Sequence, residues 1–295
     1  MTFRSGFAAF VGRPNAGKST LTNALVGSKI VITSAKPQTT RHAVRGIVTR
    51  DDAQLILVDT PGLHRPRTLL GQRLNDVVRA TLSEVDVIGF CVPADQKIGP
   101  GDRFIAAELV RLHAPVVGIV TKTDATTRQR ITAQLVALND LGEFADIVPV
   151  SAVAGEQVDV LADVLVTHLP EGPLLYPSDV STDNDTETRI AELIREASLE
   201  GVRDELPHSI AVTVEEMRPR AARPDILEIY ATIHLERDSQ KGIVIGHQGS
   251  RLKHIGSRAR AGIEELLGGR VHLDLHVAVE SDWQRDPKKL DRLGF

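Results

Sequence analysis

The chain has 295 residues, which is enough for two domains of average size. Hydrophobic residues make up 42% and charged residues 25%, which excludes a disordered chain, and the net charge of -4 excludes a molecule that is basic overall. Cys91 is the single cysteine, so a disulfide framework is excluded and a cytoplasmic location is expected. The first six residues are polar and no apolar run approaches the ~20 residues that span a bilayer, so we expect neither a signal peptide nor a transmembrane helix.

Short apolar runs recur along the first half of the chain and are separated by longer amphipathic stretches. The runs are continuous, as in strands buried on both faces of a parallel sheet, and lie at residues 7–11, 55–58, 85–92, 116–120 and 147–150. The stretches between them, such as 74–83 and 128–141, have helical spacing. This alternation predicts a doubly wound α/β domain over residues 1–170, with an antiparallel edge strand at 43–49.

The composition changes after residue 170. Residues 171–186 are rich in Pro, Gly, Ser, Thr and Asp and are predicted to form a linker. Beyond it the pattern predicts a helix, two strands, further helices and a last strand, at 188–204, 210–215, 226–235, 241–267 and 271–279. This order predicts a compact α+β domain over residues 187–295.

A phosphate-binding loop is predicted at residues 12–19, Gly-Arg-Pro-Asn-Ala-Gly-Lys-Ser. The segment matches the P-loop pattern and stands between a predicted strand and a predicted helix, the context that such a loop requires. Lys18 adds charge near the outer phosphates, and Ser19 offers a hydroxyl to magnesium. A chance glycine-rich turn is the alternative. The residues expected to contact the phosphates are Gly12, Asn15, Ala16, Gly17, Lys18 and Ser19.

Two further segments are predicted to sense the terminal phosphate. In the sequence Asp-Thr-Pro-Gly at 59–62, Asp59 can hold magnesium through water and the N–H of Gly62 can reach a γ-phosphate, although a simple turn is the alternative. Residues 37–41 lie where a mobile switch is expected, with Thr40 as the first candidate for magnesium and Thr39 as the second; a surface loop is the alternative. The predicted switch residues are Gln38, Thr39, Thr40, Asp59, Thr60, Pro61, Gly62 and Leu63.

A base-reading site is predicted where the next two buried strands end. Asp124 can accept hydrogen bonds from the ring N–H and the exocyclic amine of guanine, groups that adenine lacks in that arrangement. The stem of Lys122 can lie along the base. Ser151 and Ala152 follow the next strand and can present a backbone N–H to the guanine oxygen.

These motifs together resemble the translation-factor class of P-loop GTPases, which implies GTP and GDP with magnesium as ligands. The class usually has Asn where this chain has Thr121. One hydroxyl cannot replace both amide contacts, so we expect a weaker contact to the guanine ring nitrogen and a weaker tie to the P-loop. Specificity is then expected to depend mainly on Asp124.

Leu63 stands where many GTPases of this class carry a glutamine that orients water. Leucine cannot polarise water, so no catalytic side-chain base is identified. Related GTPases with an asparagine at the position of Asn15 and without the glutamine use a potassium ion near the phosphates. The resemblance therefore suggests Asn15 as a potassium ligand; the alternative is that Asn15 only shapes the loop.

A GxxG loop at residues 246–249 joins two helical stretches of the second domain. With the two strands before it and the helix and strand after it, it resembles a type II KH domain, whose loop holds about four nucleotides of single-stranded RNA. Residues 241–260 carry five Lys or Arg and no acidic residue, which favours phosphate binding, and apolar residues 243–245 are expected to receive bases. A solvated basic helix is the alternative. The predicted RNA-binding residues are Lys241, Ile245, Gly246, His247, Gln248, Gly249, Arg251 and Lys253.

One GTPase domain followed by one KH domain resembles the Era family, bacterial GTPases of small ribosomal subunit assembly. Further matches lie at residues 38–42, 59–64, 205–209 and 283–295, so the resemblance covers nearly the whole chain. It implies binding to the 3′ end of small-subunit ribosomal RNA and to the 30S subunit, slow hydrolysis stimulated by that RNA, and no DNA partner. It also implies weak peripheral association with the inner face of the cell membrane, which no residue of the sequence shows.

Two other functions stay open at this point. The chain can be a non-catalytic RNA scaffold that uses nucleotide only as a structural ligand. It can also be a related assembly GTPase that acts on proteins, although such proteins usually have two tandem GTPase domains where this chain has one.

Overall fold

The computed structural model describes residues 2–34, 36, 39–63, 66, 68–202, 206–221 and 223–295, with only the backbone of 207 and 208. Contacts divide the chain into two compact units, one built mainly before residue 184 and the other mainly from residue 184 onward. None of the described helices is long and apolar enough to cross a lipid bilayer.

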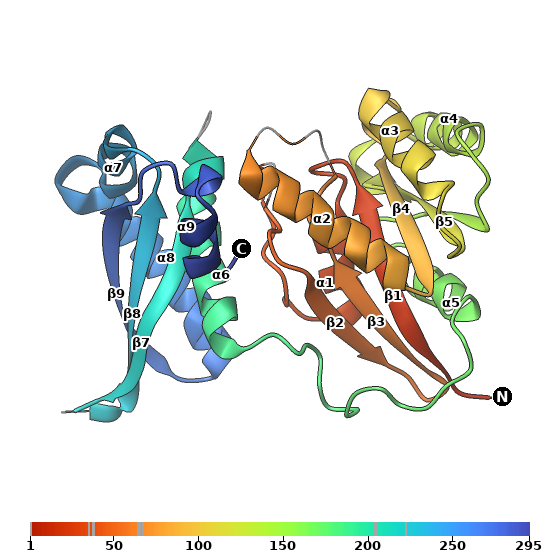
Figure 1. Cartoon of the computed structure of the whole chain (residues 1–295). Helices are drawn as coiled ribbons and strands as arrows, with labels where there is room; N and C mark the ends of the chain where they lie inside the picture. Colours follow the sequence, from red (N-terminus) through yellow and green to blue (C-terminus); the bar gives the residue numbers. More distant parts are fainter. Residues whose placement is uncertain are drawn as a thin grey trace. The chain divides into compact units, whose positions relative to one another are not determined.

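The first unit is built on a six-stranded sheet with the strand order β2-β3-β1-β4-β5-β6 (Figure 1). Every strand pair is parallel except β2 with β3, so the predicted α/β class and the antiparallel edge strand are confirmed. All positions of β3 and β4 are buried, as their continuous apolar runs predict. The strands are β1 Arg4–Gly12, β2 Val44–Thr49, β3 Ala53–Asp59, β4 Val87–Pro93, β5 Val116–Thr121 and β6 Asp146–Pro149.

Helices cover both faces of this sheet and bury two separate apolar clusters. Leu21 of α1 and Leu161 of α5 belong to one cluster. Val78 of α2, Ile105 of α3 and Leu138 of α4 belong to the other, on the opposite face (Figure 1). The helices are α1 Lys18–Val26, α2 Leu69–Glu84, α3 Pro100–Leu109, α4 Arg128–Asn139 and α5 Val158–Thr167. Because β1, β3, β5 and β6 are parallel, their carboxyl ends meet at one edge, where ligands of such sheets bind.

Much of the predicted linker lies along the first unit instead of standing free. The buried side chain of Gln54 accepts hydrogen bonds from the backbone N–H groups of Leu175 (2.8 Å) and Tyr176 (2.9 Å). On the outer edge of β2, Ile47 N donates to the carbonyl of Ser181 at 2.9 Å. The predicted domain boundaries at 170 and 187 stay predictions, but residues 175–181 are held by the first unit.

The second unit has a three-stranded sheet with the order β7-β8-β9, in which β8 is antiparallel to β7 and parallel to β9. Its strands are β7 Ala211–Arg220, β8 Arg223–Leu235 and β9 Arg270–Val279, and its helices are α6 Thr186–Leu199, α7 Asp238–Ile245, α8 Ser250–Leu267 and α9 Pro287–Arg292 (Figure 1). Ile190 of α6 and Ile263 of α8 pack in its core. The predicted α+β order of elements is confirmed.

Candidate functional site

The chain leaves β1 at Gly12 and turns through a tight loop into α1. An added Cβ at Gly12 would lie 2.6 Å from the carbonyl oxygen of Cys91, so only glycine allows β1 to approach β4 this closely. Asn15 (φ 64°) and Gly17 (φ 91°) have left-handed backbone conformations, and α1 begins directly afterwards at Lys18. The predicted P-loop is therefore a sharp turn that leads into the N-terminus of a helix, a geometry that suits an anion.

Lys18 is buried inside this loop. Its Nζ lies 3.4 Å from the carbonyl oxygen of Gly12 and 3.3 Å from that of Arg13. Burial lowers the pKa of Lys18, and the carboxylate of Asp59 partly opposes that shift. Among the described residues, only backbone carbonyl oxygens lie within hydrogen-bonding range of this buried ammonium, so a phosphate oxygen would stabilise it strongly.

Three oxygen-bearing side chains converge beside Lys18. Ser19 Oγ and Thr40 Oγ1 donate to Asp59 Oδ2 at 2.8 and 2.9 Å, and the two hydroxyls lie 2.9 Å apart. Burial raises the pKa of Asp59, and Lys18 partly opposes that shift. Within the described part of the chain, the buried Asp59 Oδ1 has no hydrogen-bond partner. A hard cation with oxygen ligands, such as magnesium, fits this cluster and would satisfy that atom.

The structure places the remaining switch residues as follows. Thr39 Oγ1 donates to the carbonyl of Lys36 at 2.6 Å, whereas Thr40, the first candidate, bonds to Ser19 and Asp59. Thr60 is buried and bonds to the carbonyl of Phe10, and Leu63 is buried in the core beside Pro61 and Gly62. An added Cβ at Gly62 would lie 3.0 Å from the backbone nitrogen of Pro14, so the two phosphate loops touch. Gln38 lies outside the described residues.

The predicted base reader is pre-oriented by a neighbouring strand end. Ser151, which is fully buried, donates from Oγ to Asp124 Oδ1 at 2.6 Å and accepts from the N–H of Ala154 at 3.0 Å. The Asp124 carboxylate is thus held in place, and the backbone of Ala152 follows directly. Lys122 adopts a left-handed conformation (φ 58°) that turns the chain out of β5 toward Asp124.

Thr121 contacts the P-loop through its side chain. Its hydroxyl donates to the carbonyl oxygen of Ala16 in the P-loop at 2.6 Å. The hydroxyl thus keeps a direct tie between this strand end and the P-loop, and the expectation that this tie is weaker than one made by Asn stays a prediction. Phosphate loop and base loop are joined directly through buried atoms.

The GxxG loop of the second unit joins α7 to α8 and depends on its glycines. Gly246 (φ 73°), Gln248 (φ 50°) and Gly249 (φ 77°) all have left-handed φ values. An added Cβ at Gly246 would lie 2.7 Å from Arg251 Cβ, whereas one at Gly249 would meet nothing within 4 Å. The loop is therefore compact at Gly246 and open at Gly249.

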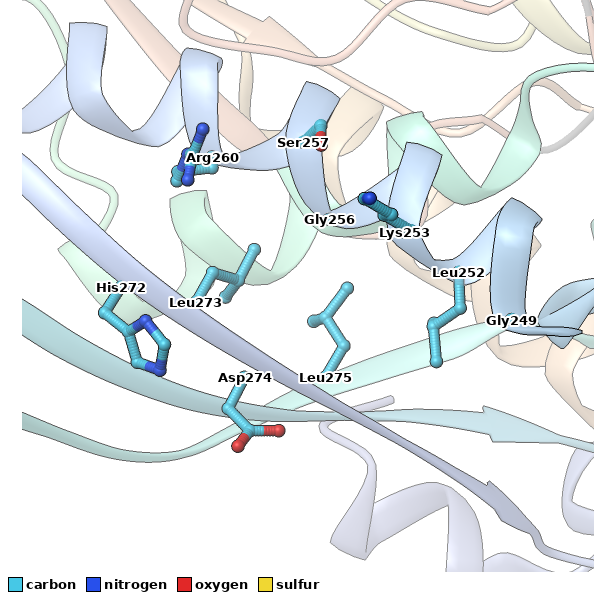
Figure 2. A pocket seen from close by; sticks show the side chains of 10 residues that line it. All are labelled: Gly249, Leu252, Lys253, Gly256, Ser257, Arg260, His272, Leu273, Asp274 and Leu275. Carbon is cyan, nitrogen blue, oxygen red and sulfur yellow. The ribbon is translucent and has the colours of Figure 1, made fainter.

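A groove of about 450 Å³ runs beside this loop between α8 and β9. Leu273 and Leu275 point from β9 toward α8, where Leu252 also lies, and Lys253 and Arg260 come from the helix (Figure 2). His272 and Asp274 project from the other side of the same strand (Figure 2). These β9 residues were missed from the sequence; the polar alternation in 271–279 is the signal that could have found them.

The structure revises which residues of the basic segment face this groove. Val244 is fully buried in the core and does not line it. Arg251 donates to the carbonyl of Glu200 at 2.6 Å, and Arg258 pairs with the Glu200 carboxylate at 3.1 Å, so both cations hold the end of α6. Lys253 and Arg260 remain as groove cations, while Lys241, Ile245 and His247 are not among the groove residues.

Two family models match separate parts of the chain. A family model described as "50S ribosome-binding GTPase" matches residues 7–122, and one described as "KH domain" matches residues 205–284. The GTPase Era of Streptomyces coelicolor is 65% identical over 301 residues, covering 99% of this chain and 95% of its own length. The chain belongs to the Era GTPase family. The GTPase Era of a Mycobacterium species (strain KMS) is 63% identical over 297 residues, with 99% of each chain covered.

Solved Era structures share the fold over the full length. A crystal structure of Era in complex with MgGDPNP and nucleotides 1506-1542 of 16S ribosomal RNA superposes with a TM-score of 0.96 at 37% identity, covering 99% of both chains. A variant of Aquifex aeolicus Era bound to GDP.AlF4- gives a TM-score of 0.95 at 37% identity, again over 99% of both chains. The chain is therefore an Era-family GTPase with a C-terminal KH domain.

Proposed function

We propose that this chain is a GTP-hydrolysing switch that holds the 3′ end region of small-subunit ribosomal RNA and assists maturation of the 30S subunit in the cytoplasm. The observation that carries the proposal is the full-length likeness to the Era that was crystallised with MgGDPNP and 16S ribosomal RNA. The geometry of both sites supports it independently.

In the nucleotide site different residues bind different parts of the nucleotide. Lys18 and the loop 12–19 receive the phosphates, with the backbone of Gly62 at the terminal one. Ser19, Thr40 and Asp59 hold magnesium, which when bound neutralises charge on the phosphate oxygens. Asp124, oriented by Ser151, binds the ring N–H and the exocyclic amine of guanine. Release of Thr40 after hydrolysis would free the segment before β2.

None of the site side chains described above can act as a base for the water that attacks the phosphate. Leu63, at the position of the usual glutamine, is apolar and buried in the core. We propose potassium as a second cation near Asn15, whose left-handed conformation bends the loop that is expected to hold the phosphates. Turnover should rise several-fold when potassium replaces sodium at equal ionic strength, and Asn15→Asp should alter that ratio. Equal rates in the two salts would remove the potassium hypothesis and leave Asn15 as a loop-shaping residue.

The RNA groove supplies two kinds of contact. Lys253 and Arg260 stand where phosphates would pass, and Leu252, Leu273 and Leu275 offer an apolar surface for bases. The open backbone at Gly249 allows a phosphate to approach closely. Arg251 contributes indirectly by holding α6. Weak association with the inner face of the membrane stays a prediction that no described residue carries.

The RNA proposal is tested with a matched pair at Gly249. Gly249→Asp and Gly249→Asn introduce the same shape and the same backbone cost, but only Asp adds a negative charge beside the expected phosphate. Fluorescence polarisation with a single-stranded RNA of the 16S 3′ end should give about tenfold weaker binding for Asp than for Asn. Equal affinities for the two variants, both close to wild type, would place RNA recognition elsewhere.

A further inference from the structure

Thr121 occupies the junction between the P-loop and the base-reading loop. Its side chain is only 3% exposed, and its hydroxyl lies 2.6 Å from the carbonyl oxygen of Ala16. Its own carbonyl accepts from the N–H of Ala94 at 2.8 Å, which fixes the backbone as well. An added Cβ at Gly17 would lie 3.5 Å from the same hydroxyl, so the P-loop packs directly on it.

The hydroxyl of Thr121 must be the donor in its bond to Ala16. A backbone carbonyl oxygen can only accept, so the hydroxyl must be the donor in the bond to Ala16. A threonine hydroxyl carries a single hydrogen, and this hydrogen has to lie between Thr121 Oγ1 and the Ala16 oxygen, because two oxygens 2.6 Å apart repel each other without it. Nothing on the hydroxyl is then left to donate to the base.

Guanine presents two different edges to a protein. The ring N–H and the exocyclic amine are donors and match the Asp124 carboxylate, whereas N7 and O6 are acceptors and need donors. Thr121 is bonded to the P-loop through Ala16, and Asp124 lies three residues further along the chain. We therefore place Thr121 on the N7 side of a guanine whose opposite edge is bound by Asp124. The oxygen lone pairs of its hydroxyl cannot bond to N7, which has no hydrogen.

We propose that this chain binds guanine nucleotides without a hydrogen bond to N7. Thr121 fastens the P-loop to β5, and the base is selected through Asp124 and the backbone after Ser151. The inference rests on the proposed guanine site. The chain accordingly accepts purine nucleotides in which N7 is replaced by a C–H group, the 7-deazaguanine nucleotides.

The test compares GDP with 7-deaza-GDP on the full chain by calorimetry with magnesium. The wild-type protein should bind the two ligands with dissociation constants within about twofold of each other. Thr121→Asn has two N–H donors, so it can reach both Ala16 and N7, and should favour GDP by about tenfold. A wild-type preference for GDP of fivefold or more would overturn the proposal, because the hydroxyl would then be donating to N7.

Two further variants keep the result interpretable. Thr121→Val keeps the shape of the side chain and removes the hydroxyl, so both ligands should bind more weakly by the same factor. A loss confined to GDP would contradict the proposal even if Thr121→Asn failed to fold. Asp124→Asn tests the guanine site itself and should shift preference toward xanthosine diphosphate. If that shift is absent, the proposed base site is misplaced, whatever the outcome with 7-deaza-GDP.

Discussion

The functional side chains of the first unit are bonded to one another, and Lys18, Thr40, Asp59 and Ser151 are buried, whereas the groove cations of the second unit are exposed. Asp59 receives both Ser19 and Thr40, and Asp124 receives Ser151, all within 3 Å. In the groove, Lys253 and Arg260 are exposed on α8. The nucleotide site is ordered by its own hydrogen bonds before a ligand binds, whereas the groove between α8 and β9 offers exposed charge and apolar surface.

This difference predicts different responses to substitution and to salt. Removing one partner of a buried polar pair leaves the other unsatisfied, so the penalties at the buried members of the nucleotide site should be large and nearly independent of salt. Exposed cations act on phosphates through a screened field, so changes in the groove should be small and salt-dependent.

The largest effect is expected at Lys18. Lys18→Ala removes the buried cation that would face the phosphates, so GTP turnover measured by phosphate release should fall at least ~100-fold. Lys97→Ala, which removes an exposed lysine after β4, is the matched control and should keep wild-type turnover. Turnover that survived in Lys18→Ala would mean that the phosphates bind elsewhere and that the chain's site was assigned wrongly.

A smaller effect is expected at Ser151. Ser151→Ala leaves the Asp124 carboxylate without its 2.6 Å donor, so GDP should bind about tenfold more weakly, with little change between low and high salt. Ser83→Ala, an exposed serine on α2, is the control. An affinity for GDP that stayed at the wild-type value would show that the Asp124 carboxylate does not need to be held by Ser151. It would also contradict the contrast between the nucleotide site and the groove.

The smallest effect is expected in the groove. Arg260→Ala should weaken RNA binding a few-fold and lower the slope of log affinity against log salt by about 0.7, the share of one phosphate on a single strand. Arg258→Ala removes a neighbouring arginine that is paired with Glu200 at 3.1 Å, so its slope should match wild type. Identical slopes for all three proteins would mean that α8 does not face the RNA backbone.

The nucleotide site could be predicted from sequence because each of its segments follows a buried strand directly. The carboxyl ends of parallel strands meet at one edge, so the order of strands and motifs along the chain is enough to predict that Lys18, Asp59 and Asp124 converge. A tie between Thr121 and the P-loop was expected, but its partner, the carbonyl of Ala16, was not predicted, because the bond joins residues 105 positions apart and depends on the rotamer of one side chain.

Only one part of the groove, the GxxG loop, could be predicted from the sequence. The GxxG loop is local in sequence, but the other wall belongs to β9, whose place beside α8 is set by packing of the whole unit. The charge pattern could not show that Arg251 turns toward α6 or that Val244 points into the core. The contacts of Gln54 with residues 175–176 were likewise hidden, since a buried glutamine in a strand has no motif.

The account is tested most directly by a crystal structure of this chain with magnesium and a non-hydrolysable GTP analogue. We predict one nucleotide with Lys18 Nζ on its phosphates and the Asp124 carboxylate on its guanine, and with Thr121 still bonded to Ala16. Lys18 and Asp124 contacting separate molecules, or the base turned away from Asp124, would contradict it.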